Sequence, residues 1–479
     1  MQTDSAPSKD RFPPQIPFII GNEACERFSF YGMRNILTVF LIDYLLREAS
    51  PDLAVRTSLA KANFHLFVSG VYFFPLLGGY IADRYFGKYR TILWLSILYV
   101  IGHACLAAFE SSPSGFYTGL FLIALGSGGI KPCVSSMVGD QFTEANKHLV
   151  NKVFAIFYWS VNFGSFFASL LIPKTLKLYG PAVAFGIPGI LMAIATVIFW
   201  LGRRLYVDVP PTGQNPHSFL RVVRSALANR GSGGHWLDGA KRAHPEAAVE
   251  GAKAVFRVLA VFAPIPFFWM LFDQKASTWV VQAKAMDPKI GPFTFEPSQM
   301  QLVNPALVMV LIPFTTAVFY PAMRRAGLEL TPLRRMPLGL AIGALSYVIA
   351  GSIQIAIDGG AYLSILWQVA PYIVLTIAEI LVSTTGLEFA YSQAPREMKG
   401  TIMSFWNLTV TAANLAVALA SALNVFKGPA QFFFYAGLAL LAAIALVFIA
   451  RGYKVVDYFQ RSAPVPEPAG GEASPSKAG

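Results

Sequence analysis

The sequence is poor in charged residues and cysteines, and several enzyme motifs are absent from it. Only 13% of its 479 residues are charged, whereas a soluble domain typically carries about 25%. Three cysteines in apolar segments provide no disulfide framework. The six histidines are scattered, and there is no His-x-x-Glu-His, Gly-x-Ser-x-Gly or phosphate-loop motif. These absences argue against a soluble domain, a disulfide-rich secreted protein, an enzyme and a metal site.

Long apolar runs dominate the chain instead, and 55% of its residues are hydrophobic. A membrane-spanning helix needs roughly 20 mostly apolar residues, and in lipid only helices or closed barrels satisfy their own backbone. The runs are too long for barrel strands, and the first is too long for a signal peptide. We therefore predict an all-α polytopic protein of the lipid bilayer with about twelve spans. The expected spans are 15–46, 59–82, 91–109, 114–139, 150–173, 181–202, 254–283, 298–322, 334–355, 362–394, 398–424 and 430–450.

The polar segment 203–252 separates six spans from six. We predict an N-terminal bundle (1–202), a cytoplasmic linker (203–252), a C-terminal bundle (253–457) and a disordered tail (458–479) rich in Pro, Gly, Ala and Ser. Part of the linker is suited to an amphipathic helix on the cytoplasmic surface. This layout predicts two pseudo-symmetric bundles with a substrate site between them near the midplane.

The net charge of +12 is explained by orientation in the membrane. Basic residues concentrate in alternate loops, for example within 84–90, 203–230, 324–335 and 451–454. By the positive-inside rule, both termini are therefore cytoplasmic. We expect a multi-pass protein of the plasma membrane, which is the inner membrane in a bacterium, and no nucleic-acid partner.

The loop "GGYIADRYFGKYR" (78–90) resembles the signature of the major facilitator superfamily, in which Gly, three residues and Asp-Arg precede Gly and basic residues. We expect Gly79 to allow a close helix approach and Asp83 to accept hydrogen bonds from helix-end amides. Together with the two groups of six spans, the resemblance implies the major facilitator fold.

The first apolar run contains "GNEACERFSFYGMR" (21–34), which carries four charges. A charge at mid-membrane costs about 3 kcal/mol or more. At 100° per residue, Glu23, Glu26, Arg27, Tyr31 and Arg34 lie on one stripe about 140° wide. We expect this stripe to face a central cavity rather than lipid. A purely structural ladder of ion pairs is the alternative interpretation.

Four charges are expected to form pairs between the bundles. Arg34 and Asp273 both lie about 20 residues, or roughly 30 Å, from the cytoplasmic start of their spans. Their depth and opposite signs predict a pair on the periplasmic side. Lys131 and Glu379 have no opposite charge nearby in their own spans, which predicts a second pair on the cytoplasmic side. Two such pairs would form a gate that opens when the acid is protonated.

Three other side chains stand out within the spans. His65 is either a hydrogen-bonding structural group or, given an ordinary histidine pKa of about 6.5, a proton acceptor on the periplasmic side. Both interpretations stay open. Trp269 and Trp406 lie deep in their segments, which favours walls of a cavity over anchors at the membrane interface.

Six segments in order resemble the proton-dependent oligopeptide transporter family. They are "ERFSFYG", "PLLGGYIADRYFGKYR", "GSGGIKPCVSSMVGDQF", "FYWSVNFGSF", "FWMLFDQKASTW" and "GLEFAYSQAPREMKG". The matches extend from the first to the eleventh span, so they cover nearly the whole membrane domain. The resemblance implies symport of di- and tripeptides with protons by alternating access.

The resemblance also implies which residues form the site. Proton coupling is implied for Glu23, Glu26, Arg27, His65, Asp273 and Glu379, and the gate pairs for Arg34 with Asp273 and Lys131 with Glu379. Peptide binding is implied for Arg27, Tyr31, Tyr72, Lys131, Tyr158, Asn162, Trp269, Asn304, Glu379, Ser383 and Trp406. Glu388 belongs to the more obvious motif, but the family's substrate-facing glutamate lies nine residues earlier, at Glu379.

The chain departs from the family pattern at two places. The family motif has two tyrosines before its glycine, whereas this chain has Phe30 in place of the first, which removes one hydroxyl from the pocket. Many bacterial members insert two extra helices between the bundles. Residues 203–252 are too polar for that, which predicts twelve helices rather than fourteen.

A dipeptide is zwitterionic, and these residues suit its shared groups. Arg27 and Lys131 suit the carboxylate and Glu379 the ammonium. The amides at 162 and 304 suit the peptide backbone, and the two tryptophans would line adaptable side-chain pockets. The alternative is a major facilitator transporter of another small solute, or a drug/proton antiporter. We expect a monomer that uses protons as coupling ion and needs no other cofactor.

Overall fold

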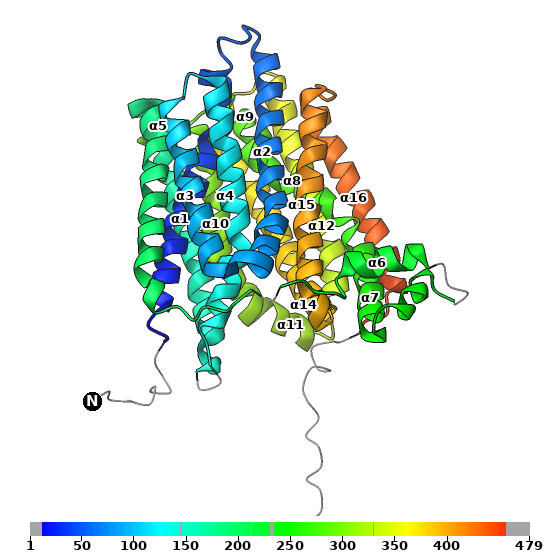
Figure 1. Ribbon diagram of the computed structural model, residues 1–479. Helices are drawn as coiled ribbons and strands as arrows, with labels where there is room; N and C mark the ends of the chain where they lie inside the picture. The colour runs from blue at the N-terminus through cyan, green and yellow to red at the C-terminus, as the bar shows by residue number, and fades with distance from the viewer. Residues whose placement is uncertain (1–11, 144–145, 212, 230–233, 329, 457–479) are drawn as a thin grey trace, which may run out of the picture.

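The computed structural model describes residues 12–143, 146–211, 213–229, 234–328 and 330–456, so the predicted tail 458–479 lies outside the described residues. Long helices run side by side across the molecule (Figure 1). The first half contains α1 (Ile16–Phe40), α2 (Leu53–Ile81), α3 (Gly87–Ala108), α4 (Pro113–Asp140) and α5 (Val150–Leu201). The second half contains α7 (Glu246–Phe262), α8 (Ile265–Asp273), α9 (Thr278–Lys284), α10 (Val303–Phe314), α11 (Tyr320–Arg325), α12 (Pro332–Asp358), α13 (Val369–Glu379), α14 (Thr385–Ser392), α15 (Lys399–Ala422) and α16 (Pro429–Gly452).

Short irregular turns interrupt or join these helices. Four π-helical turns are Leu41–Leu45, Ala82–Phe86, Thr315–Phe319 and Ile380–Thr384. Turns of 3-10 helix are Lys147–Leu149, Gly202–Arg204, Trp236–Arg242, Gln274–Ala276, Pro297–Leu302, Ile365–Gln368 and Arg396–Met398. Between α9 and α10, β1 (Lys289–Ile290) pairs antiparallel with β2 (Phe293–Thr294). We call the end of the molecule that carries the α1–α2 and α15–α16 loops the distal end, and the opposite end, where α1 begins, the proximal end (Figure 1).

The described helices agree with twelve spans. Eight continuous helical stretches are long and apolar enough to cross a membrane, and α7 with the bent α8–α9 segment makes a ninth. Two of the eight, Leu53–Ala108 and Val150–Arg204, each contain two predicted spans. The second breaks at Gly180, whose φ of 81° departs from helical geometry. Counting each of these two stretches as two spans raises the number from nine to eleven. Helix α1 is the twelfth, because only its four charges keep it from meeting the apolar criterion.

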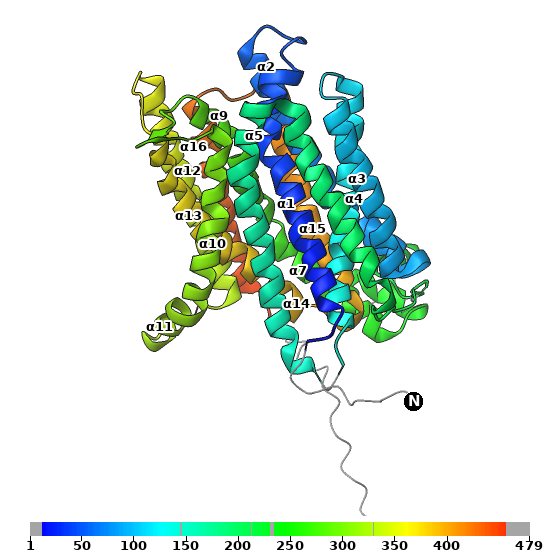
Figure 2. The same ribbon diagram turned by 90° about the vertical axis from the view of Figure 1, so that its left-hand side faces the viewer.

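The apolar core divides between the two halves of the chain. One cluster of buried hydrophobic residues comes from positions 16–199, with Ala276 as its single member from the second half. Two other clusters come from positions 219–446. Helix α2 packs against α15, and α5 packs against both α1 and α10, so these helices line the seam between the bundles (Figure 2). This arrangement agrees with the two groups of six spans that the sequence predicts.

A glycine contact sets the spacing of α2 and α4. A Cβ atom on Gly78 would lie 2.2 Å from the carbonyl oxygen of Gly129, so only glycine fits at that point. The equivalent atom on Gly79 would have Pro132 Cγ at 4.0 Å as its nearest neighbour. The prediction that Gly79 permits the close approach was therefore wrong by one residue, because the crossing point depends on how the two helices are rotated.

The segment between the bundles contains little helix. Helix α6 (Phe219–Ala228) has 10 residues and the 3-10 turn Trp236–Arg242 has 7, and neither is long enough to span a bilayer. Helix α7 begins at Glu246, eight residues before the predicted start of the seventh span. Within the described residues, this segment therefore holds no pair of extra spanning helices.

The hydrogen bonds and ion pairs between the bundles cluster at the distal end. Lys284 Nζ lies 2.6 Å from Asp43 Oδ1, and Lys177 Nζ lies 2.7 Å from Glu296 Oε1. Thr38 donates a hydrogen bond of 2.8 Å to the carbonyl oxygen of Ala276. These contacts hold the two bundles together at that end.

Candidate functional site

Three of the charges on α1 form one buried cluster. Arg27 Nε lies 3.0 Å from Glu23 Oε1 and also pairs with Glu26. Ser127 on α4 approaches Glu26 Oε1 at 3.5 Å. Glu26 is fully buried, and the other two charged side chains are nearly so. Since a buried charge needs a partner, this mutual pairing explains how α1 tolerates three charges within five residues.

Lys131 does not meet Glu379 in this structure. Its Nζ lies 4.5 Å from the ring centroid of Tyr72 and 4.9 Å from that of Phe30, so two aromatic rings provide its contacts. The predicted Lys131–Glu379 ion pair is therefore wrong for this conformation. The physical reason is that each charge has found partners within its own bundle, while the contacts between bundles lie at the distal end.

Glu379 is held by an amide of its own bundle. It is the last residue of α13, directly before the π-helical turn Ile380–Thr384. Asn304 donates a hydrogen bond of 2.7 Å to Glu379 Oε2, and Lys275 donates one of 2.7 Å to Asn304 Oδ1. Lys275 was missed by the sequence reasoning, although a lysine two residues after Asp273 in an apolar segment was a visible signal.

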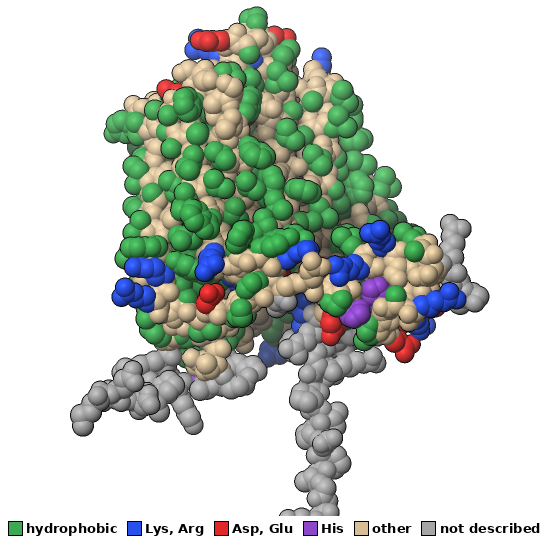
Figure 3. All heavy atoms as spheres, viewed as in Figure 1, with side chains coloured by type: hydrophobic (Ala, Val, Ile, Leu, Met, Phe, Trp, Pro, Cys, Tyr) green, Lys and Arg blue, Asp and Glu red, His purple; other side chains and the backbone are tan. Residues whose placement is uncertain are grey.

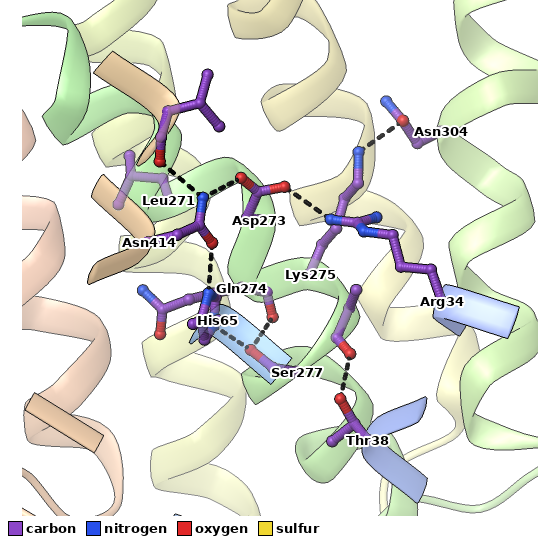
Figure 4. Close-up of polar contacts among 12 residues, drawn as sticks. Arg34, Thr38, His65, Leu271, Asp273, Gln274, Lys275, Ser277, Asn304 and Asn414 are labelled. Atoms are coloured by element: carbon purple, nitrogen blue, oxygen red, sulfur yellow. Dashed lines mark hydrogen bonds and ion pairs between the residues drawn. The ribbon is translucent and has the colours of Figure 1, made fainter. Parts of the chain in front are cut away.

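The distal charge pair has the geometry that the sequence predicts. Arg34 Nη2 lies 2.7 Å from Asp273 Oδ1, and both side chains are buried (Figure 4). The pair joins α1 of the first bundle to α8 of the second. Asn414 on α15 donates a second hydrogen bond, of 2.8 Å, to Asp273 Oδ2. Both carboxylate oxygens of Asp273 are thus engaged.

His65 belongs to the same hydrogen-bond network (Figure 4). Its Nδ1 lies 2.7 Å from Asn414 Oδ1, and its Nε2 lies 2.8 Å from the hydroxyl of Ser277. Because the Asn414 amide nitrogen donates to Asp273, its oxygen must accept from Nδ1–H. A neutral His65 then accepts from Ser277 through Nε2. This arrangement agrees with both interpretations of His65, as a structural group and as a proton acceptor.

The two predicted tryptophans face each other inside the second bundle. The ring centroids of Trp269 and Trp406 are 6.0 Å apart in an edge-to-face arrangement. Both are buried, which is unlike an anchor at the membrane interface. A Cβ atom on Gly386 would lie 2.1 Å from the Trp406 ring, so this glycine provides the space for the indole.

The other predicted peptide-binding residues lie on α1, α2 and α5 and in the turn after α13. Tyr158 is 44% exposed, and Asn162, which is buried, donates its side-chain amide to the Tyr158 carbonyl at 3.0 Å. Tyr31 and Tyr72 are half-buried, and Ser383 lies in the π-helical turn after Glu379. A π-helical turn inserts an extra residue into the helix, so the direction of Ser383 relative to Glu379 differs from that in a regular helix.

The comparisons with known proteins agree on one family. A model of the POT family matches residues 89–430. Peptide transporter 3 of Caenorhabditis elegans is 39% identical over 369 residues, which is 72% of this chain and 51% of that protein. Solute carrier family 15 member 2 of Mus musculus is 37% identical over 370 residues, or 73% of this chain and 50% of that protein. The chain thus spans about half the length of the curated relatives it matches.

Solved structures match over nearly their whole length. The crystal structure of the POT family transporter PepTSo is 52% identical, with a TM-score of 0.88, and the match covers 92% of this chain and 99% of that one. An auto-inhibited POT family peptide transporter is 49% identical with the same TM-score, over 93% of this chain and 98% of its own. A peptide transporter solved with alafosfalin is 24% identical with a TM-score of 0.77, over 92% of this chain and 95% of its own, and therefore supports the fold alone.

Proposed function

Because the chain belongs to the POT family, we propose that it is a proton-coupled symporter that imports di- and tripeptides by alternating access. The observation that carries this proposal is the division of charged side chains between the bundles. Arg27 and Lys131 belong to the first bundle, whereas Glu379 belongs to the second. A zwitterionic ligand that bridges the seam would satisfy both sides.

In this proposal the two ends of the peptide are recognised by different bundles. Arg27 and Lys131 bind the carboxylate, and Glu379 binds the ammonium. Tyr31, Tyr72, Tyr158, Ser383 and the amides of Asn162 and Asn304 bind the peptide backbone, and Trp269 and Trp406 line the side-chain pockets. The cation–aromatic contacts of Lys131 support its role, because its ammonium forms no ion pair with an acid among the described residues.

Coupling follows from what a proton does to each acid. A proton on Glu379 removes its charge, which frees Asn304 and Lys275 and changes how the second bundle receives an ammonium. A proton on Asp273, delivered directly or through His65, weakens the Arg34 pair at the distal end. The Glu23–Glu26–Arg27 cluster links the peptide carboxylate to further carboxylates that can take up protons. Protons are the coupling ion in this scheme, and no other cofactor takes part.

We propose that the proximal end faces the cytoplasm of a cell whose plasma membrane holds this protein as a monomer. Lys and Arg side chains gather around the proximal end, with few charges on the surface above them (Figure 3), as the positive-inside rule requires. In this orientation the distal contacts close the outer side. Residues 1–202 and 253–457 would then act as the two moving bundles, joined by 203–252.

Uptake by purified protein in proteoliposomes tests the proposal. An alanyl dipeptide should accumulate under an acidic-outside gradient, and free alanine should not. Accumulation of the dipeptide that ignores the proton gradient would refute proton coupling. Transport of alanine, or efflux of a lipophilic cation in exchange for protons, would favour another solute or a drug/proton antiporter.

A further inference from the structure

A cavity lies at the distal end, apart from the residues of the proposed peptide site. Its volume is about 370 Å³, and it forms where α2 of the first bundle meets α9, α15 and α16 of the second. The polar side chains that carry the argument are Lys61, Thr278, Gln282, Ser421, Lys427 and Gln431. The cavity therefore exists only while the two bundles are in contact at this end.

Two lysines line this cavity, and none of its lining residues is acidic. Lys61 Nζ contacts the neutral Gln431 side chain, at 3.0 Å from Oε1. Lys427, in the loop before α16, is exposed. In the described part of the chain, neither ammonium forms an ion pair. Asp358 is not a lining residue; its carboxylate lies beside Gly428, where a Cβ atom would be 3.0 Å from Oδ2, and it accepts a hydrogen bond from Gln354.

The remaining polar groups of the wall also favour an acceptor ligand. Gln431 is buried, and its amide nitrogen already donates to Gln274 at 3.1 Å and to Thr278 at 3.3 Å. Ser421 is 8% exposed, and its hydroxyl has no hydrogen-bond partner among the described residues. Two ammonium groups and an unpartnered hydroxyl can all donate, and an oxyanion offers only acceptors.

We propose that this cavity binds a small oxyanion, a carboxylate or a phosphate, between Lys61 and Lys427. The ligand acts as a clamp, because Lys61 belongs to α2 of the first bundle and Lys427 to the α15–α16 loop of the second. Any motion that separates the bundles at the distal end moves the two lysines apart. A ligand held by both lysines therefore binds the distally closed state in preference to the open one.

The cavity is also connected to the charge pair between the bundles. Lys61 lies one helical turn before His65 on the same face of α2. From Lys61 the hydrogen bonds pass through Gln431 to Gln274, which directly follows Asp273 in the chain. An anion at Lys61 and the Arg34–Asp273 pair thus both stabilise the distal contact between the bundles, each at a different position.

Thermal unfolding of the purified full chain tests binding without any transport assay. Phosphate or acetate, compared with chloride at equal ionic strength, should raise the melting temperature by about 2 °C or more in a saturable way. Lys61→Gln and Lys427→Gln should each abolish the shift. Lys174→Gln is the matched control, because Lys174 is exposed near the same end and does not line the cavity.

The two salts distinguish the ligand class: a shift with phosphate alone assigns a phosphate site, and a shift with acetate alone a carboxylate site. An equal shift in Lys61→Gln or Lys427→Gln, or none with either anion, would overturn the site.

Distances between spin labels test the clamp. Labels at Leu53 and Leu419, which are exposed on α2 and α15, report the separation of the distal ends in a protein without its three cysteines. Phosphate or acetate should increase the population of the shorter distance, and Lys61→Gln should remove this response while Lys174→Gln keeps it. Binding with no change in the distance distribution would overturn the clamp. Because neither measurement uses transport, their failure is distinguishable from failure of the proposed peptide uptake.

Discussion

His65 and Asp273 are joined by the side-chain amide of Asn414. The amide oxygen lies 2.7 Å from His65 Nδ1, and the amide nitrogen lies 2.8 Å from Asp273 Oδ2. Since Asp273 also pairs with Arg34, four helices of two bundles, α1, α2, α8 and α15, meet at this amide and carboxylate. A change of charge on Asp273 or His65 therefore alters the contacts that join the two bundles.

The Asn414 amide offers a test of this network by substitution. Asn414→Ala leaves one buried acceptor and one buried donor without partners and should cost about 1–3 kcal/mol of stability. Asn414→Asp places a second carboxylate beside Asp273, so the variant should be less stable at pH 8 than at pH 5, where one of the two facing carboxylates can hold a proton. Asn63→Asp on α2 is the control, because Asn63 bonds Tyr117 within the first bundle. A pH response of Asn414→Asp that equals the wild type would contradict this role.

Glu379 is the acid expected to couple protons to accumulation. Glu379→Gln keeps the shape of the side chain and its acceptor oxygen for Asn304 but removes the titrating group. We expect dipeptide counterflow to persist while gradient-driven accumulation falls to background. Glu388→Gln is the matched control, since Glu388 pairs with Arg335 at 3.3 Å on the exposed side of the neighbouring helix. Concentrative uptake by Glu379→Gln would exclude Glu379 as the coupling acid.

Lys275 and Glu379 should behave as one unit because both bond the Asn304 side chain. Lys275→Gln removes the cation of that unit and should reduce accumulation as Glu379→Gln does. The double variant should then be no worse than either single variant. A double-mutant cycle on gradient-driven uptake measures this, and effects that simply add would show that the two residues act independently.

Arg27 is expected to serve both folding and substrate binding, so its test needs two variants. Arg27→Ala leaves Glu23 and Glu26 buried without their cation, which should cost about 3–5 kcal/mol. Arg27→Lys keeps the charge but loses the planar guanidinium, so the protein should fold while dipeptide affinity drops by tenfold or more. Ligand-dependent melting of Arg27→Lys measures the affinity. An unchanged dipeptide shift in that variant would remove Arg27 from carboxylate recognition.

The packing of α2 on α4 gives a purely structural prediction. Gly78→Ala places a Cβ atom against the backbone of Gly129 and should destabilise the first bundle by about 1–3 kcal/mol. Gly79→Ala makes the same chemical change one residue later, where there is room, and should be nearly neutral. The melting temperatures of the two variants test which glycine lies at the α2–α4 crossing, and equal values would contradict the close approach at Gly78.

The spans and much of the charge pattern could be predicted because they depend on one-dimensional properties. Runs of about twenty apolar residues locate the helices. A charge inside the membrane is costly, which singles out Arg34 and Asp273. Their equal depth along their spans then predicts that they meet. Lys131 and Glu379 were paired because neither has an opposite charge nearby in its own span, and this prediction was wrong. That reasoning assumes that every charge in a membrane needs an opposite charge as its partner, whereas aromatic rings contact Lys131 and an amide bonds Glu379.

The sequence by itself determined the twelve spans, the family and the residues that must avoid lipid, because hydrophobicity and helical period act locally along the chain. Only the tertiary structure decided which partners those residues take. Asn304 between Lys275 and Glu379, Asn414 between His65 and Asp273, and the glycine at the α2–α4 crossing depend on how helices distant in sequence are rotated and spaced. Rotating a helix about its axis by a few tens of degrees exchanges one neighbouring side chain for another, and no local sequence pattern predicts that rotation.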